Sequence, residues 1–218
     1  MVGVEKLQEY WQVAGPTLAF MLGVSVLALA LALERWLTLW RARNALTRVE
    51  EKVLEAARRG DFEASRRHAD ALPSPIREVF TAGLDRALGR VRGEFATAMT
   101  RESRRAVAHL RGPLWLLGSV GALMPFAGLL GTVVGVMSSF EAIGTSGQGG
   151  FAVVSAGISE ALIATAAGLF VALEAVLFFN ALSQQVAGVG RELNLAVDEL
   201  GELIRTGRTH AERPVVDG

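Results

Sequence analysis

The residue of this sequence best suited to chemistry is Glu160, a carboxylic acid set in a long apolar run. The run occupies residues 151–183, and its charged members are Glu160 and Glu174. A helix of about 20 apolar residues crosses a bilayer, and a carboxylate inside such a helix costs roughly 2.5–3.5 kcal/mol or more. Desolvation disfavours the charged form of a carboxyl group, which favours a group that gains and loses a proton. The sequence therefore predicts a functional, proton-exchanging role for Glu160.

Two threonines extend the polar character of this region. Thr165 follows Glu160 by five residues, about 140° of helix rotation, so the two side chains occupy adjacent sectors of one helix. Thr132 lies in a second uncharged run, residues 113–140, at the centre of the sequence GLLGTVVG. Threonines in membrane helices often bond to carbonyl groups of their own helix. Two interpretations of these hydroxyls therefore stay open, a local bond of that kind or a polar strip shared with Glu160.

The elements that must position these residues are three membrane-spanning helices. No charge occurs in residues 16–33 or 113–140, and most of the arginine lies in residues 41–111. We predict an all-α integral membrane protein, with long cytoplasmic extensions of the second and third spans and small cytoplasmic helices. The expected segments are a periplasmic N-terminal segment (1–15), the first span (16–40), a cytoplasmic helical loop (41–112), the second span (113–141), a periplasmic loop (142–150), the third span (151–183), and a cytoplasmic C-terminal helix and tail (184–218).

The basic residues predict the orientation of these spans. Residues 41–111 contain sixteen Lys and Arg against ten Asp and Glu, and basic loops stay in the cytoplasm. The N-terminus is therefore expected outside and the C-terminus in the cytoplasm. A cleaved signal peptide is the rival interpretation of the first span, but the segment before it is not basic and its apolar run is long. The basic loop does not indicate nucleic-acid binding, because acidic residues are interspersed and no aromatic residues alternate with the arginines.

Apolar spacing predicts the helices of the cytoplasmic segments. One face collects Val49, Val53, Leu54 and Ala57, and Gly60-Asp61 ends that helix. A turn at residues 72–75 (LPSP) precedes a second helix, expected to run unbroken from Ile76 to Met99 with Phe80, Leu84, Leu88, Val91 and Phe95 on its apolar face. After the third span, a further stripe consists of Val186, Val189, Leu193, Val197, Leu200 and Leu203 or Ile204.

Small residues in the second span indicate close helix contacts. Gly128, Gly131 and Gly135 recur at spacings of three and four, which lets helix backbones approach closely in lipid. Pro125 is a candidate kink in the same helix. The sequence has no cysteine, and its three histidines have no metal-ligand or catalytic spacing. We therefore expect no metal site, no cofactor and no enzyme.

Three stretches carry a resemblance to a known family. Residues 129–144 (LLGTVVGVMSSFEAIG), 157–173 (GISEALIATAAGLFVAL) and 178–182 (FFNAL) resemble the ExbB/TolQ/MotA proton-channel family. The three spans and the short chain match the ExbB/TolQ branch, whereas the MotA branch has four spans. The likeness is specific over residues 113–182 and only architectural elsewhere.

The resemblance implies a function and an assembly. In that family five copies surround two copies of a single-span partner of the ExbD/TolR type, whose transmembrane aspartate carries protons. The family's glutamate matches Glu160, and its pore threonines match Thr132 and Thr165. The implied activity is that of a proton-channel subunit in the bacterial inner membrane, coupling the proton-motive force to TonB-type transport, Tol-type envelope maintenance or surface motility. A TonB-like or motility protein is then a further partner, besides membrane lipid.

One residue departs from the family's pattern. Glu174 stands where the family usually has proline, and it follows Glu160 by fourteen residues, about 21 Å along a helix and about 40° from the same face. We expect it nearer the cytoplasmic interface, where water reaches it. It is a candidate second polar station, a water-facing exit group, or the partner of an arginine in a neighbouring copy.

Two other functions compete with the proton channel. A pore or carrier for a small solute is the first, but the chain is short and has few polar groups in its spans and no inverted repeat. A non-conducting membrane scaffold whose basic loop binds a cytoplasmic partner is the second, and it leaves Glu160 unexplained. Co-purification with a small single-span protein that carries a membrane aspartate would favour the channel over both.

Overall fold

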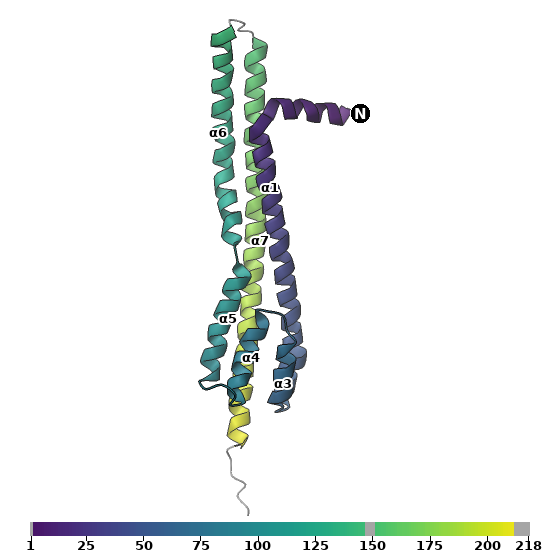
Figure 1. Ribbon diagram of the computed structural model, residues 1–218, viewed down its shortest axis with the longest axis vertical. Coiled ribbons are helices and arrows are strands. Elements are labelled where there is room, and N and C mark those ends of the chain that lie inside the picture. Colours follow the sequence, from purple (N-terminus) through teal and green to yellow (C-terminus); the bar gives the residue numbers. More distant parts are fainter. Residues whose placement is uncertain (1, 147–150, 212–218) are drawn as a thin grey trace, which may run out of the picture. The chain divides into compact units, whose positions relative to one another are not determined.

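The computed structural model describes residues 2–146 and 151–211, and all elements in these ranges are helical (Figure 1). Side chains are described in the same ranges except at residues 2–16, 142, 145, 146, 151–154, 156, 160 and 208–211. The elements are α1 (Val2–Arg48), the π-helix η1 (Val49–Leu54), α2 (Glu55–Arg58), α3 (Phe62–Asp70), α4 (Ile76–Ala87), α5 (Phe95–Arg111), α6 (Leu114–Ser146) and α7 (Phe151–Ala211).

The predicted all-α class with three spans is confirmed. Within the described residues, three segments are long and apolar enough to cross a membrane, namely Thr17–Arg58, Phe95–Glu141 and Gly157–Gly207. The chain divides into two compact units. The first unit comprises Met1–Leu33 and Pro113–Ala181, and the second comprises Glu34–Gly112 and Leu182–Gly218.

The first unit, called here the membrane unit, combines parts of α1 and α7 with the whole of α6. Each helix contributes to a small core, formed by Met21 from α1, Met124 from α6, and Val171 and Ala172 from α7. Large apolar side chains also point outward. Phe20, Phe126 and Phe170, one from each helix, are 61%, 68% and 68% exposed. Apolar surface of this extent suits lipid or another protein copy rather than water.

The second unit contains the short helices α2 to α5 together with η1, the end of α1 and the end of α7. The predicted apolar faces are confirmed here, because Val49, Val53, Leu54 and Ala57 are all buried. The predicted stripe on α7 is confirmed as well, with Val186, Val189, Leu193, Val197, Leu200 and Ile204 buried. Gly60 ends the first segment with a φ of 79°, and the side chain of Asp61 then caps α3 by accepting from the backbone N–H of Ala64 at 2.8 Å.

An ion-pair cluster joins α3 and α4 in the second unit. Arg66 of α3 donates from Nε to Asp85 of α4 at 2.7 Å, and it also pairs with Asp70 at 2.6 Å. The hydrogen bond to Asp85 is the main cause that raises the pKa of Arg66, with a smaller contribution from Asp70. Arg66 therefore stays charged, and its role is to hold two short helices together.

The prediction of one helix from Ile76 to Met99 is wrong. The structure has α4 and α5 instead, and Gly89 and Gly93 between them adopt φ of 73° and 121°. Such angles end a right-handed helix at little steric cost in glycine. Val91, expected on the apolar face, is 44% exposed. Apolar residues continue at helical spacing between α4 and α5 by coincidence. The backbone angles of the two glycines, not this spacing, end the helix.

Glu94 starts α5 as its N-cap. Its carboxylate accepts from the backbone N–H of Thr97 at 2.6 Å and from that of Ala96 at 3.2 Å. Hydrogen bonds from Thr97, and to a smaller extent from Ala96, lower the pKa of Glu94. A negative charge at a helix N-terminus is also favoured by the helix dipole. The cap therefore acts in its ionised form.

The expected helical extension of the second span is interrupted. α5 ends at Arg111, Gly112 adopts a φ of 45°, and α6 starts at Leu114. Pro113 between them lacks a backbone N–H and so cannot continue the hydrogen-bond ladder of α5. Pro125, by contrast, lies inside α6, which continues on both sides of it. The third span has no such break, because α7 runs for 61 residues from Phe151 to Ala211.

The ends of the predicted segments also differ from the helix bounds. α1 begins at Val2, so residues 2–15 are helical, and α6 extends to Ser146, into the segment expected as a loop. The rest of that loop, residues 147–150, and the tail from residue 212 lie outside the described residues.

Candidate functional site

The contact between α6 and α7 in the membrane unit is built on backbone-to-backbone approach. A Cβ atom added at Gly168 of α7 would lie 2.7 Å from the carbonyl oxygen of Met124 and 3.0 Å from the Cα of Gly128. Both of these atoms belong to the backbone of α6, so they cannot rotate away. Glycine at position 168 is therefore what allows the two helices to lie this close.

The three glycines singled out in the second span all lie against α7. A Cβ at Gly128 would lie 3.0 Å from the Cα of Thr165. At Gly131 and Gly135 it would lie 3.0 Å from the methyl groups of Ala164 and Ala161, respectively. Small residues on one helix thus face small residues on the other, the arrangement that favours helix association in lipid.

Thr165 contributes a polar bond to this contact. Its hydroxyl donates to the backbone carbonyl oxygen of Gly128 at 2.8 Å, from α7 to α6. The bond forms because Gly128 has no side chain to separate the two backbones. A hydroxyl has one proton and two lone pairs, so the oxygen of Thr165 can still accept a hydrogen bond from water or from a proton carrier.

Thr132, the other threonine of the predicted path, is not joined to Thr165 by a hydrogen bond in the described structure. The hydroxyl of Thr132 donates to the carbonyl of Leu129 in its own helix at 2.6 Å. This is the local bond that the sequence left open, and it likewise leaves the lone pairs of the oxygen available. The backbone of Glu160 belongs to α7, but its side chain lies outside the described residues.

Glu174 has a partner that the sequence did not indicate. The hydroxyl of Ser25 in α1 donates to Oε2 of Glu174 in α7 at 2.8 Å, in a partly buried position. Ser25 lies in the middle of the uncharged residues 16–33. The expected position of Glu174 nearer the cytoplasmic interface stays a prediction. The uncharged run 16–33 contains a single serine, Ser25. Its spacing along α1 did not show which residue of α7 lies opposite it.

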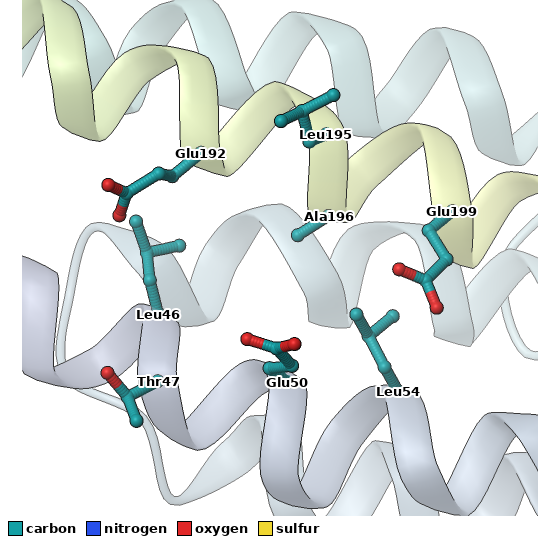
Figure 2. A pocket seen from close by; sticks show the side chains of 8 residues that line it. All are labelled: Leu46, Thr47, Glu50, Leu54, Glu192, Leu195, Ala196 and Glu199. Carbon is teal, nitrogen blue, oxygen red and sulfur yellow. The ribbon is translucent and has the colours of Figure 1, made fainter.

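The second unit offers a groove of a different character. It lies between the end of α1 with η1 and the end of α7, and Figure 2 shows the carboxyl groups of Glu50, Glu192 and Glu199 near the apolar side chains of Leu46 and Leu54. Its lining residues are Leu46, Thr47, Glu50, Leu54, Glu192, Leu195, Ala196 and Glu199. Glu199 is held by Arg58 at 2.5 Å. The groove contains none of the predicted path residues. Among the residues with described side chains, no group of three or more His, Cys, Asp or Glu could hold a metal ion.

Comparison with known proteins identifies the family. The model of the MotA/TolQ/ExbB proton channel family matches residues 71–194. The Tol-Pal system protein TolQ of Pseudomonas aeruginosa is 33% identical over 179 residues, which cover 73% of this chain and 77% of that protein. The biopolymer transport protein ExbB of Neisseria meningitidis is 30% identical over 197 residues, 83% of this chain and 90% of the relative. ExbB of Xanthomonas campestris is 38% identical over 133 residues, 60% of this chain and 51% of the relative.

The family match covers more than half of the 218 residues and includes α6 and most of the apolar part of α7. The relatives extend the similarity over most of the remaining chain. Both groups of relatives, TolQ and ExbB, come from one branch, and their family consists of channel and transport-associated subunits rather than enzymes. The chain therefore belongs to the MotA/TolQ/ExbB proton channel family, in its ExbB/TolQ branch.

Proposed function

We propose that the chain is a proton-channel subunit of an energy-transducing motor in the bacterial inner membrane. The observation that carries this proposal is the family match, because residues 71–194 include Thr132, Glu160 and Thr165. The three apolar segments and the bacterial relatives support the location. The driven machine is of the kind that the relatives' names describe, a Tol-Pal system or biopolymer transport. Surface motility, which the resemblance to the family also implies, is a third candidate.

Glu160, Thr132 and Thr165 form the proposed proton path. Glu160 takes up and releases the proton, since a carboxyl group in a membrane is favoured in its neutral form but can ionise when a partner stabilises the charge. The two threonines supply hydroxyl oxygens. Each uses its proton on a backbone carbonyl, so each presents lone pairs to water or to a hydronium ion.

The proposed assembly is a homopentamer around a single-span partner of the ExbD/TolR type. The support is the likeness to TolQ and ExbB, and the need to keep Glu160 away from lipid. The partner's transmembrane aspartate would exchange protons with Glu160 as the chains move. Native mass measurement of the complex in mild detergent should give five copies of this chain, and a monomer with or without the partner would contradict the proposal.

The proposed orientation places the N-terminus in the periplasm and the C-terminus in the cytoplasm. Its support is the excess of basic residues in 41–111. A cysteine substituted for Pro75 should then react with a membrane-impermeant reagent only after the cells are opened. Labelling of that cysteine in intact cells would reverse the orientation.

The decisive experiment replaces Glu160 by glutamine, which keeps the size and hydrogen bonding but cannot exchange a proton. Complexes with the single-span partner are purified, shown to be intact, and placed in vesicles with a pH-sensitive dye inside. Glu160→Gln should nearly abolish partner-dependent proton flux, whereas Glu160→Asp should retain a measurable part of it. Wild-type flux in the intact Glu160→Gln complex would rule out the role assigned to this carboxyl group.

A further inference from the structure

A second pocket of the second unit combines basic and apolar side chains. It has a volume of about 350 Å³ and lies between the end of α1 and the turn that follows α3. Its lining consists of Trp40, Arg41, Asn44 and Arg48 from α1 and residues 71–73 from the turn. The lining has two arginines and no acidic residue, whereas the groove described above has three glutamates and no basic residue. The charge of this pocket therefore favours an anion.

The polar side chains of the pocket lie on one face of α1 and are available to a ligand. Arg41, Asn44 and Arg48 follow one another at spacings of three and four residues, which places them on one side of the helix. Among the residues with described side chains, none forms an ion pair or a side-chain hydrogen bond with these three. Side chains of a helix lean toward its N-terminus, so the guanidinium group of Arg48 can reach back toward the other two. Guanidinium groups bind phosphate through paired N–H donors.

The wall that the turn contributes is apolar and offers an anion no backbone donor. The backbone N–H groups of Ala71 and Leu72 donate to carbonyl oxygens of α3 at 3.3 and 3.2 Å, and Pro73 has no N–H. The adjacent acid, Asp70, pairs with Arg66 at 2.6 Å. A free phosphate ion would find donors on one side of the pocket only. A phosphate group that carries a hydrocarbon tail would find a matching surface on both sides.

The pocket begins at the end of the first predicted span. Trp40 is the last residue expected in that span, and Arg41 follows it directly on the same helix. Trp36 and Trp40 are 49% and 56% exposed, and tryptophans at the end of a span are typical of the headgroup level of a membrane. Basic residues next to a span attract anionic lipids. Phospholipid headgroups are therefore the phosphate groups nearest to this pocket.

We propose that Trp40, Arg41, Asn44 and Arg48 bind the headgroup of an anionic phospholipid such as phosphatidylglycerol. The two guanidinium groups and the amide N–H of Asn44 donate to the phosphate. The indole ring of Trp40 and the apolar wall at residues 71–73 contact the glycerol and the first methylene groups. The site requires that the chain spans a membrane, which its fold class implies, and it does not depend on proton conduction.

Lipid binding to the full-length protein, purified in its own assembly in a mild neutral detergent, tests the site. Native mass spectrometry counts the bound lipids during titration with phosphatidylglycerol or phosphatidylcholine, with and without inorganic phosphate. Phosphatidylglycerol should bind more tightly than phosphatidylcholine, and inorganic phosphate at the same concentration should not displace it. Arg41→Gln and Arg48→Gln should each weaken the binding of phosphatidylglycerol about fivefold, and the double variant about 25-fold, because each basic residue near a membrane surface contributes roughly that factor.

The chain offers a matched control for each wall of the pocket. Arg43 is an exposed arginine of α1 that does not line the pocket, so Arg43→Gln removes the same charge and should leave the affinity unchanged. Ala71→Glu adds a negative charge to the pocket wall and should weaken the binding of phosphatidylglycerol. Ser74→Glu adds the same charge to the same turn outside the pocket and should not. All substituted positions are exposed, so the variants should fold.

Four results would overturn the site. Equal binding of the two lipids would exclude recognition of an anionic headgroup. An equal loss of affinity in Arg43→Gln and Arg41→Gln would reduce the effect to the general charge of the segment. Displacement of the lipid by inorganic phosphate would make the pocket a site for the free ion, and displacement by an acidic peptide would make it a site for a protein partner. Proton flux enters none of these measurements, so a failure of the channel function leaves their outcome unchanged.

Discussion

Replacing Gly168 by alanine is the sharpest test of how α6 and α7 are held together. The added Cβ would lie 2.7 Å from the carbonyl oxygen of Met124 and 3.0 Å and 3.1 Å from the Cα and N of Gly128. These separations are well below an ordinary carbon contact of 3.5–4.0 Å. Because the opposing atoms are backbone atoms, the helices themselves have to move apart.

The expected loss of stability follows from two opposing terms. Inserting an extra methyl group into a well-packed contact costs about 1–3 kcal/mol. Alanine in place of glycine inside a helix returns roughly 0.5–1 kcal/mol. The net loss should be about 1–2 kcal/mol, which corresponds to a roughly 5- to 30-fold change in the unfolding equilibrium.

The chain contains a matched control for this substitution. A Cβ added at Gly23 of α1, in the same membrane unit, would have no atom within 4 Å. Gly23→Ala should therefore be neutral or slightly stabilising. Both variants are unfolded reversibly by titrating a denaturing detergent into mixed micelles at one protein concentration, because assembly makes stability depend on concentration.

The comparison between positions is what can refute the packing. We expect the order of destabilisation to be Gly168→Ala, then Gly131→Ala, then Gly23→Ala, since the opposing atom at Gly131 is a methyl group at 3.0 Å rather than backbone. Equal stabilities of the Gly168 and Gly23 variants would show that α6 and α7 do not approach as closely as described. Loss of proton flux with unchanged stability would instead indicate that Gly168 acts on the path.

Two further predictions concern single hydrogen bonds. Thr165→Val should lower stability by about 0.6 kcal/mol, the average for membrane hydrogen bonds, and it should also reduce proton flux per intact complex. Thr165→Ser should restore both stability and flux. If Thr165→Val lowered stability without reducing flux, the threonine would be a structural residue. The stabilisation of α5 by the Glu94 cap should depend on pH. Because the pKa of Glu94 is lowered, the ionised cap stabilises the helix above the usual carboxyl pKa range. This stabilisation is lost as pH falls through the lowered pKa. Hydrogen exchange at the Thr97 amide, corrected for its intrinsic pH dependence, should accelerate with acid in the wild type and much less in Glu94→Gln; identical profiles would assign the acid sensitivity to another group.

The elements with a regular apolar pattern could be predicted from the sequence. Uncharged runs marked the three spans, and apolar stripes at helical spacing marked the buried faces of η1 and the end of α7. These patterns work because the same burial that stabilises a helix also decides which of its faces is apolar. Gly60-Asp61 could be predicted as a break for a different reason, since glycine and aspartate both favour the end of one helix and the start of the next.

The breaks that the sequence analysis missed depend on backbone angles. Apolar residues continue at helical spacing through Val91, yet Gly89 and Gly93 adopt positive φ and separate α4 from α5. The second span was predicted with a long cytoplasmic extension, although Pro113 after Gly112 lacks the backbone N–H donor that a continuous helix needs. In both cases local backbone chemistry prevailed over the apolar spacing.

The position of Glu174 could not be predicted because rotation and axial register are different quantities. Counting residues places Glu174 about 40° from Glu160 around α7, but it gives no information on which helix lies opposite. Its partner comes from α1, through a hydrogen bond between residues 149 positions apart. A contact of such sequence separation depends on how three helices with apolar surfaces slide along one another. Gly128 and Gly168 allow the close approach of α6 and α7, but they do not contact α1. The Ser25 to Glu174 bond therefore reflects the register of α1 against α7, which residue spacing within either helix does not encode.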